Sequence, residues 1–498
     1  MSSSSNISKT TYLVFGQTLT TIITFVLAPY LARKMSLHEY GTFSQVVLIF
    51  DFVNILIGLG LAQVLYVFLE KHSDNPGPLL STLLSVQVFA ACAGSLIVYV
   101  ISFYIGEIFK EPALKEYTRV YLPNLCVMSF VNMFGLILVY FNRHRTYILI
   151  AVLLSLSKLA AVFLLSIGGL LSVRNILLAY IIANFLGLIV LFIFQPVQFF
   201  RFRFSKKLSI EILKRSLPLG ITGVLGSSYI YIAGLIISAY LSAAQYAIYR
   251  NGSFEMPVLG TLYSSFSLVF LPQISRLILQ DNYQQVIFIK RMVINSTVSI
   301  IYPVILFFLF FHHEFITLYL SDKYSESAII FLIINCGLLL RFQDYTDVLI
   351  SLNKGYYVMK ANIIFFVSNT ILNIVLINFF GYIGCAISIV ISVALLSGLL
   401  LNKTVKLLKT SLASLLDYKL IFKILIIIAA VLSIIKFFVS YFGASRIFIF
   451  CGIFPAYLIL IYLLLLKTKL INMNYFISFL GTMPLIGNRL VILTRKLF

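Results

Sequence analysis

A few charged residues of this chain lie inside long apolar runs, where a charge is costly and usually faces a cavity or a partner. Among them are Asp51, Lys158, Arg341, Asp344 and Asp347. A guanidinium or ammonium group at such a depth can bind the oxygens of a phosphate. A buried carboxylate beside a cation can exchange protons, because desolvation and the neighbouring charge act on it in opposite directions. These residue types therefore predict anion binding and ion coupling.

Two arginines near the ends of apolar runs extend the set of candidates. We expect substrate binding from Arg33, Lys158, Arg250 and Arg341, and ion coupling from Asp51, Asp344 and Asp347. Polar residues at helical spacing in the same runs, Gln17, Thr24 and Asn54, are expected to face a cavity, with Pro29 as a hinge. The alternative is that the charges form salt bridges that fix helix packing, and that Arg33 and Arg250 anchor the chain at the interface.

The elements that must position these residues are membrane-spanning helices. Hydrophobic residues make up 61% of the 498 residues and charged residues only 11%, whereas a soluble protein carries about 25% charge. Runs of about 18 apolar residues or more can span the hydrocarbon core as helices, and these are too long and too uniformly apolar for barrel strands. We predict an all-α polytopic membrane protein with about fourteen spans, near 10–32, 41–69, 79–106, 118–141, 147–171, 175–196, 216–240, 252–272, 293–318, 327–350, 359–379, 382–402, 418–440 and 447–467.

The basic residues fix the expected orientation. Lys and Arg together number 37 against 16 Asp and Glu, and alternate loops share them at about three to one, the bias expected of cytoplasmic loops. The richer side includes the loop 201–215, Lys290 and Arg291, and both termini. We therefore expect both termini in the cytoplasm, and the net charge of +21 to reflect topology and not a nucleic-acid partner.

Several classes of chemistry find no support in the sequence. The five cysteines fall inside apolar runs without CxxC spacing, so we read them as small buried hydrophobes and expect no metal and no disulfide. No nucleophile elbow, P-loop or paired-carboxylate motif has a supporting context, and we expect no enzymatic activity and no cofactor. A membrane polysaccharide polymerase or ligase would present a large outer loop, and the short loops here leave no room for one.

An internal repeat divides the chain. The segment 35–43 is echoed at 241–249, and Asn142-Arg143 is echoed by Asn353-Lys354, each time just before a predicted span. Two halves in the same orientation predict a pseudo-two-fold axis along the membrane normal and a site between them. We expect a six-helix bundle in 1–200, a cytoplasmic basic linker in 201–215, a second six-helix bundle in 216–405, and two extra helices with a cytoplasmic tail in 406–498.

Three segments carry a resemblance to a known family. The stretch 28–45 (APYLARKMSLHEYGTFSQ) resembles the first loop of bacterial polysaccharide transporters, the O-antigen and capsule flippases of the multidrug/oligosaccharidyl-lipid/polysaccharide exporter superfamily. The stretch 271–276 (LPQISR) resembles the end of their eighth span, and 369–374 with 381–386 their eleventh and twelfth. The resemblance implies two six-helix bundles around a central cavity, and an undecaprenyl-pyrophosphate-linked oligosaccharide as cargo.

The resemblance also implies a place and partners for the protein. It would flip the lipid-linked oligosaccharide from the inner to the outer leaflet of the bacterial cytoplasmic membrane by alternating access, driven by a proton gradient, a sodium gradient or the membrane potential. Partners would be membrane lipids, a polysaccharide polymerase and a chain-length regulator. The alternatives are a lipid II flippase or a multidrug exporter of the same superfamily, a membrane polymerase or ligase, and a non-transporting scaffold.

Overall fold

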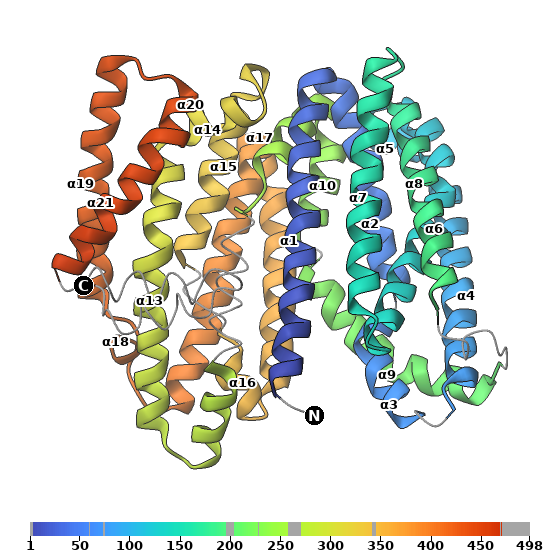
Figure 1. Ribbon diagram of the computed structural model, residues 1–498, viewed down its shortest axis with the longest axis horizontal. Coiled ribbons are helices and arrows are strands. Elements are labelled where there is room, and N and C mark those ends of the chain that lie inside the picture. Colours follow the sequence, from blue (N-terminus) through green and yellow to red (C-terminus); the bar gives the residue numbers. More distant parts are fainter. Residues whose placement is uncertain are drawn as a thin grey trace. The chain divides into compact units, whose positions relative to one another are not determined.

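The computed structural model describes residues 3–58, 60–72, 75–195, 204–227, 229–256, 270–340, 345–468 and 470, and these residues form helices and connecting turns (Figure 1). They fall into two compact units. Unit 1 contains Met1–Arg250 and Thr370–Cys385, and unit 2 contains Asn251–Asn369 and Ala386–Phe498. This grouping follows proximity alone, so the two related halves expected from the repeat stay a prediction.

Unit 1 is built from long helices that pack against one another. Its elements are α1 (Ser3–Lys34), α2 (Leu37–Ile57), α3 (Leu61–Lys71), α4 (Gly77–Ile101), α5 (Ile105–Ile108), α6 (Ala113–Tyr140), α7 (His144–Ile167), α8 (Val173–Ile193), α9 (Lys206–Ser227), α10 (Tyr229–Tyr240) and α11 (Ala243–Gly252). Helix α6 packs against α4, α2 and α8, while α7 packs against α1 and α8. Helices α2, α4, α6, α7 and α8 are long and apolar enough to cross a membrane, as expected where one face meets lipid and the other meets protein.

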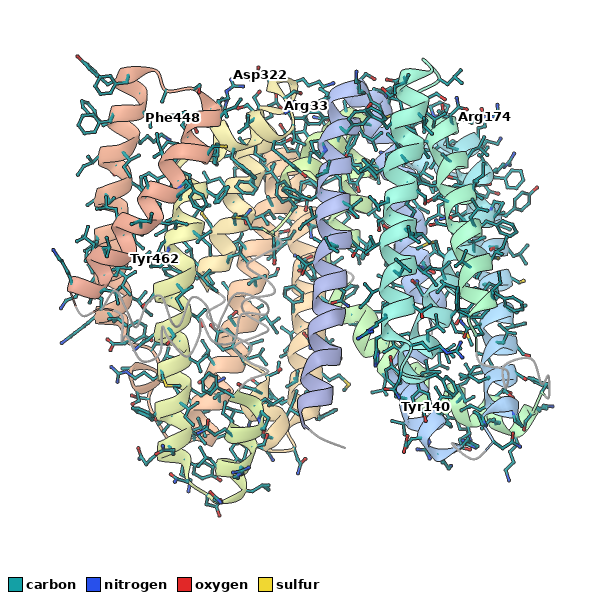
Figure 2. The ribbon with its side chains drawn as sticks, in the orientation of Figure 1. Arg33, Tyr140, Arg174, Asp322, Phe448 and Tyr462 are labelled. Atoms are coloured by element: carbon teal, nitrogen blue, oxygen red, sulfur yellow. The ribbon has the colours of Figure 1, made fainter. Side chains whose placement is uncertain are left out.

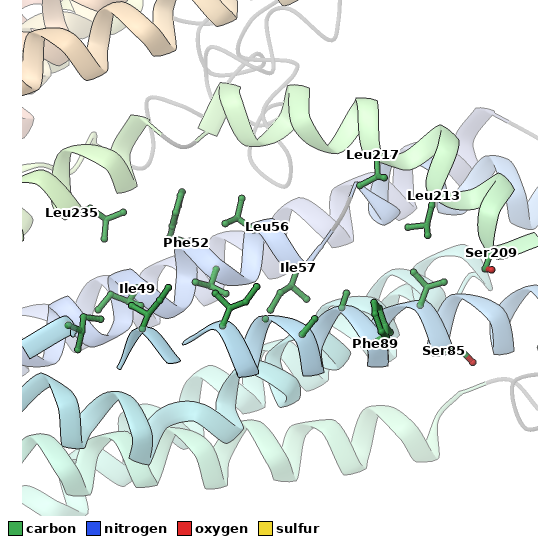
Figure 3. Close-up of a pocket in the computed structure, with 18 of the residues that line it drawn as sticks. Ile49, Phe52, Leu56, Ile57, Ser85, Phe89, Ser209, Leu213, Leu217 and Leu235 are labelled. Atoms are coloured by element: carbon green, nitrogen blue, oxygen red, sulfur yellow. The ribbon is translucent and has the colours of Figure 1, made fainter. Parts of the chain in front are cut away.

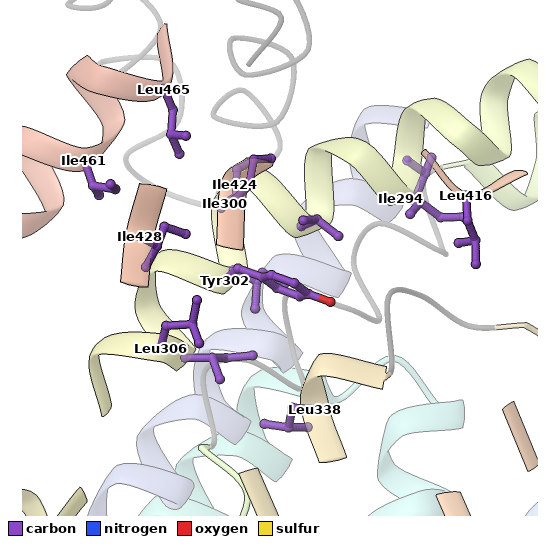
Figure 4. Close-up of a cluster of buried hydrophobic side chains, with 14 of the residues drawn as sticks. Ile294, Ile300, Tyr302, Leu306, Leu338, Leu416, Ile424, Ile428, Ile461 and Leu465 are labelled. Atoms are coloured by element: carbon purple, nitrogen blue, oxygen red, sulfur yellow. The ribbon is translucent and has the colours of Figure 1, made fainter. Parts of the chain in front are cut away.

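Unit 2 has a core formed around one long helix. Its elements are Phe270–Leu279, α13 (Tyr283–Phe310), α14 (His312–Tyr319), η2 (Asp322–Tyr324), α15 (Ser327–Cys336), η3 (Gly337–Leu340), α16 (Asp347–Ser351), α18 (Leu412–Leu415), α19 (Tyr418–Phe442), α20 (Arg446–Phe448), η4 (Ile449–Ile453) and α21 (Phe454–Lys467). Residues of α13, α19 and α21, among them Ile300, Ile428 and Ile461, form a continuous buried cluster (Figure 4). Helix α17 (Gly355–Leu407) contributes to both units and is interrupted by non-helical backbone at Gly381.

Tyrosine hydroxyls stabilise this core where a proline interrupts the backbone ladder. Pro303 lies inside α13 and cannot donate the hydrogen bond that a helix residue normally makes. Two tyrosines of α21 donate to carbonyls of that region, Tyr462 to Ile300 at 2.7 Å and Tyr457 to Pro303 at 3.0 Å. An apolar environment offers no water for such groups, so these bonds also fix how α21 sits on α13.

Most of the predicted spans coincide with helices. Within the described residues, nine helices are long and apolar enough to cross a membrane, and the count is ten if the bent pair Lys206–Gly226 and Tyr229–Tyr240 is one span. The predicted spans 359–379 and 382–402 lie on either side of Gly381 within the single element α17. Most of the predicted span 252–272 lies outside the described residues. The chain is thus a helical multi-pass protein, and the expected count of fourteen stays a prediction.

Two expectations about individual spans were wrong. The run 41–69 is not one helix, because α2 ends at Ile57 and α3 begins at Leu61. Gly60 has a left-handed φ of 69°, and a Cβ there would collide with the backbone of Ser216 and Gly220 in α9. Only glycine can adopt this conformation at such a close approach to another backbone. The helix is therefore interrupted at the point where α9 crosses it.

Lys290 and Arg291 were expected in a loop but belong to α13. The helix begins at Tyr283, where the Asn282 side chain accepts a hydrogen bond from the Gln285 backbone at 3.2 Å. Lys290 can lie inside the helix bundle because Asp347 neutralises it. The hydropathy pattern placed this span about ten residues late because it treats any lysine as solvated.

The repeated segments have the same local structure. Ser36 and Glu39 form a reciprocal cap at the start of α2, with backbone-to-side-chain distances of 3.0 and 3.2 Å. Ser242 and Gln245 form the same cap before α11, at 3.1 and 3.3 Å. Gly41 in the first copy lies against the Ala243 carbonyl of the second, too close for a side chain.

The second repeated pair also matches in geometry. Asn142 and Asn353 both take a left-handed conformation, with φ of 59° and 56°. The next residue in each case donates its backbone N–H to a carbonyl five residues earlier, at 2.9 Å for Arg143 and 2.8 Å for Lys354. Both are the helix-ending motif that asparagine tolerates well. The sequence echo therefore reflects a repeated local structure.

Candidate functional site

Three of the predicted charges come together in unit 1. Asp51 of α2 interacts electrostatically with Lys158 of α7 and with Arg250 of α11. The cap at Ser242 fixes where α11 starts, and Arg250 lies two turns further along that helix. The structure thus brings Asp51 within electrostatic reach of two of the predicted bases, Lys158 and Arg250.

Tyrosines surround this cluster. The Lys158 Nζ atom lies 5.5 Å from the ring centroid of Tyr180, within reach of a cation–π interaction. Tyr121, Tyr231 and Tyr246 are within electrostatic reach of Asp51. Phenol rings of this kind offer a hydroxyl and an apolar face together, which suits a ligand that has both polar and apolar surfaces.

Hydrogen bonds position one of these tyrosines. Tyr121 shares a side-chain hydrogen bond with Asn124, one turn further along α6. The Asn184 amide of α8 donates to the Asn124 carbonyl oxygen at 2.7 Å, and both asparagines are buried. A buried amide without a partner would be costly, so this bond between α6 and α8 is expected to persist. It thereby helps to hold Tyr121, which is within electrostatic reach of Asp51.

Reasoning from the sequence missed the tyrosines, although the repeat contained a signal. Tyr40 and Tyr246 occupy the same position, four residues after the capping serines Ser36 and Ser242. Both lie within electrostatic reach of Arg250. A repeat that carries the same side chain at matching positions could have been recognised from the sequence.

The charges of the cluster are accessible although they lie within a helical unit. Asp51 and Arg250 are exposed and Lys158 is half-buried. With two bases and one acid, the cluster has a formal charge of +1 when Asp51 is ionised. An accessible cationic group in a medium of low polarity attracts anions strongly, because a low dielectric constant weakens the Coulomb attraction less than water does. The cluster can therefore bind an anionic group.

The remaining polar candidates of α1 and α2 are more dispersed. Asn54 is half-buried one turn beyond Asp51, and Gln17 and Thr24 are exposed on α1. The Thr24 hydroxyl donates to the Thr20 carbonyl at 2.9 Å, so its hydrogen bond is made within its own helix.

The two candidates at the far end of α1 lie near its C-terminal end. Pro29 is an internal residue of α1, which continues to Lys34. Arg33 is exposed in the last turn (Figure 2), where a cation is favoured by the helix dipole.

In unit 2, one of the predicted acids is held in a buried ion pair. Both carboxylate oxygens of Asp347 accept from Lys290 Nζ at 2.6 Å. The Lys290 side chain is 2% exposed and the Asp347 side chain 5%. Arg341 and Asp344 lie outside the described residues. Among the residues that are described, no three His, Cys, Asp or Glu side chains are grouped as a metal site would require.

Comparison with known proteins gives the family. A family model described as polysaccharide biosynthesis protein matches residues 7–278, more than half of the chain. The chain belongs to the polysaccharide biosynthesis protein family. The match covers α1 to α11, and so includes Asp51, Lys158 and Arg250. No curated protein matches this member of the family in sequence.

Solved structures show that this member of the polysaccharide biosynthesis protein family shares the fold of the MOP superfamily. A lipid II flippase, MurJ, in an inward closed conformation matches with a TM-score of 0.69 at 16% identity, over 92% of this chain and 98% of the flippase. An inward-facing MATE multidrug resistance transporter matches at 0.60 and 14%, over 78% and 94%. A superfamily transporter from Pyrococcus furiosus, described as having a binding pocket of reversed polarity, matches at 0.52 and 13%, over 81% and 96%.

Proposed function

We propose that this protein is a flippase, which moves a polyprenyl-pyrophosphate-linked oligosaccharide from the inner to the outer leaflet of a bacterial cytoplasmic membrane. The observation that carries the proposal is the accessible cluster of Asp51, Lys158 and Arg250 in a member of the polysaccharide biosynthesis protein family. The shared fold of MOP superfamily transporters supports alternating access as the mechanism. The product would be used for surface polysaccharides such as O-antigen or capsule.

The cationic cluster supplies the binding that such a cargo needs. A sugar and pyrophosphate headgroup cannot enter hydrocarbon unaided, because each unpaired polar group costs several kcal/mol. Arg250 offers a planar fork of donors for phosphate oxygens, and Lys158 adds a second positive charge. The surrounding tyrosines would contact the sugars. No bond is made or broken in this cycle, so the protein would act as a transporter and not as an enzyme.

Asp51 gives the cluster a means of coupling. While ionised, Asp51 competes with a phosphate for Lys158 and Arg250, because all three charges interact. Binding of a proton or a sodium ion at Asp51 would raise the formal charge of the cluster from +1 to +2 and strengthen anion binding. Loss of that ion would favour release. Asp344 and Asp347 stay alternative candidates for this role.

The membrane potential can contribute to export. It acts on a charge at about 2.3 kcal/mol per 100 mV, so a headgroup with two negative charges would gain roughly 4–5 kcal/mol on leaving a negative interior. This gain requires that the empty transporter returns without compensating charge. Transport measured with and without an imposed potential therefore separates this drive from ion exchange at Asp51.

The test is a flipping assay in proteoliposomes with a fluorescent polyprenyl-pyrophosphate oligosaccharide. We expect Lys158→Gln and Arg250→Gln each to lower the rate by roughly tenfold to a hundredfold, the size of a lost charge-assisted hydrogen bond. Lys403→Gln is the matched control, because Lys403 is also half-buried and its Nζ atom lies 5.2 Å from a tyrosine ring, that of Tyr357. The control should transport at the normal rate.

Other outcomes would change the proposal. Normal rates in both Gln variants that insert and fold normally would exclude the cationic cluster as the binding site. Faster transport of lipid II than of the oligosaccharide would identify a lipid II flippase instead. Export of a lipophilic cation would favour a multidrug exporter, although Lys158 and Arg250 argue against it because they repel cations. If the protein transported no lipid at all, the remaining candidate function would be a non-transporting scaffold in polysaccharide assembly.

A further inference from the structure

A long apolar groove lies in unit 1, and Asp51, Lys158 and Arg250 are not among the residues that line it. Its volume is about 910 Å³, near the upper end of the roughly 300–1,000 Å³ typical of ligand sites. Figure 3 shows it between α2, α4 and the α9–α10 pair, with Phe52, Leu56, Phe89 and Leu217 pointing into it. Apart from Ser85 and Ser209, the lining is entirely apolar. A polar headgroup would find no partner there, whereas a hydrocarbon chain would.

The groove is longer than one leaflet of the bilayer. Its lining on α4 runs from Ser85 to Ile101, roughly 24 Å at 1.5 Å per residue. One leaflet contributes only about 15 Å, half of the ~30 Å hydrocarbon core. A chain that fills the groove therefore crosses the middle of the membrane. The acyl chains of a phospholipid end near that point, and a single longer tail does not.

The groove is open at the side, so a tail can enter from the bilayer. Phe89 and Ile97 on α4 line it and are 77% and 56% exposed. Small residues of α4, including Ala93, form its floor. A lipid held here keeps its tail in apolar surroundings during the whole crossing.

One end of the groove is basic. Phe204 and Ser209 line this end, and Lys206 and Lys207 lie between them in the first turn of α9 with exposed side chains. The nearby Glu211 is already engaged by Lys71 at 3.1 Å and by Arg215 at 3.5 Å. The two lysines therefore present positive charge at the mouth of an apolar groove, which is complementary to a lipid with a phosphate headgroup. This end belongs to the loop expected in the cytoplasm.

We propose that this groove holds the polyprenyl tail of the lipid-linked cargo while its phosphate groups first meet Lys206 and Lys207. The proposal rests on the proposed function for the identity of the cargo. It places loading at the α4–α9 side of unit 1. The tail then occupies a fixed track, and only the headgroup has to be transferred to the charged cluster of Asp51, Lys158 and Arg250.

The experiment uses the full-length protein in lipid nanodiscs. One sample receives a long-chain polyprenyl phosphate with a photoreactive diazirine in its tail, and another receives phosphatidylglycerol with a diazirine in an acyl chain. After irradiation, labelled peptides are mapped by mass spectrometry. The prenyl probe should label groove residues of α2, α4 and α9, and phosphatidylglycerol at the same concentration should neither label them comparably nor compete.

Matched variants test the two parts of the groove. Ala93→Phe fills the floor and should lower prenyl labelling about tenfold, the factor expected when two methylenes are displaced from an apolar site. Cys92→Phe makes a similar change at the next residue, which is exposed and does not line the groove, and should label normally. Lys206→Gln with Lys207→Gln should weaken labelling, whereas the exposed pair Lys354→Gln with Lys423→Gln should not.

The outcomes separate this inference from the proposed function. Prenyl labelling outside the groove in a protein that still flips the oligosaccharide would overturn the inference alone. Equal labelling by phosphatidylglycerol would also overturn it, since the groove would then be an ordinary lipid contact. If the groove residues were labelled but the protein flipped no lipid, the groove would still be supported as the tail-binding site, and the proposed function would be wrong. The mapping on the unchanged protein does not depend on how the variants fold.

Discussion

At the scale of single residues, the same side chains serve different purposes according to what they meet. Asp51 and Asp347 are both aspartates inside apolar helical segments. Asp51 is exposed and interacts with two cations, Lys158 and Arg250. Asp347 is buried and accepts hydrogen bonds from Lys290 through both carboxylate oxygens. A buried pair of this kind is costly to break, because it leaves one charge without compensation. A role for Asp347 in ion coupling would require that cost to be met in every cycle.

The pair predicts a clear effect on stability. Asp347→Asn should destabilise unit 2 by about 3–5 kcal/mol, since it removes the carboxylate that accepts from the buried Lys290 Nζ atom through both oxygens. The double variant Lys290→Met with Asp347→Leu should recover most of this loss. Thermal unfolding of the detergent-solubilised protein measures both. Asp322→Asn is the control, because its pair with Arg446 at 2.8 Å is surface-exposed and is expected to change stability by less than about 1 kcal/mol. Equal melting of wild type and Asp347→Asn would contradict the structural role.

At the scale of elements, capping residues decide where the helices begin. Asp417 accepts from the Leu420 backbone at 3.2 Å at the start of α19 and from Arg291 of α13 at 2.6 Å. The hydrogen bond from Arg291 is the main reason that the pKa of Asp417 lies below its ordinary value of 3.8. One carboxylate therefore both starts a helix and ties it to its neighbour. The capping boxes at Ser36 and Ser242 likewise start the repeated helices α2 and α11, with bonds made within each helix start.

The lowered pKa of Asp417 predicts a pH dependence. Because the folded state favours the ionised form, its contribution to stability is fully present above pH 3.8 and is lost as the pH falls through the lower, folded pKa. Asp417→Asn should therefore lower the unfolding temperature at pH 7, by an amount corresponding to about 0.2–1 kcal/mol for this partly exposed pair. The difference from wild type should vanish in strong acid. A constant difference at all pH values would show that the ion pair contributes nothing.

At the scale of the whole molecule, the distribution of charge sets how the chain is threaded through the membrane. The proposed loading end of the groove and the basic segment 204–215 must both face the cytoplasm if the cargo is collected from the inner leaflet. The bias of Lys and Arg between alternate loops predicts this orientation. It also places Lys323, between α14 and α15, on the opposite side.

Single cysteines test the orientation. In a background where the five native cysteines are replaced by serine, Lys207→Cys should react with a membrane-impermeant maleimide only after the cells are opened. Lys323→Cys should react before that step, and Lys354→Cys should behave like Lys207→Cys. Both side chains, Lys207 and Lys323, are exposed, so accessibility and not burial is measured. The reverse pattern would require an inverted protein and would remove the basis for loading at Lys206 and Lys207.

The sequence by itself determined that the chain is a helical membrane protein, because long apolar runs in a bilayer leave few alternatives to helices. It also indicated the family, and it located the repeated segments whose caps the structure shows. These features depend on local composition and short-range hydrogen bonds, which are fixed within a few residues of the chain.

Tertiary structure decided which charges meet. That Lys158 and Arg250 share Asp51, that Lys290 lies inside a span against Asp347, and that Gly60 breaks the run 41–69 under α9 all depend on contacts between distant segments. The groove along α4 depends on them as well, since its walls come from α2, α4, α5, α9 and α10. Hydropathy describes how each residue partitions between water and lipid, but a partner from another helix can reverse that preference.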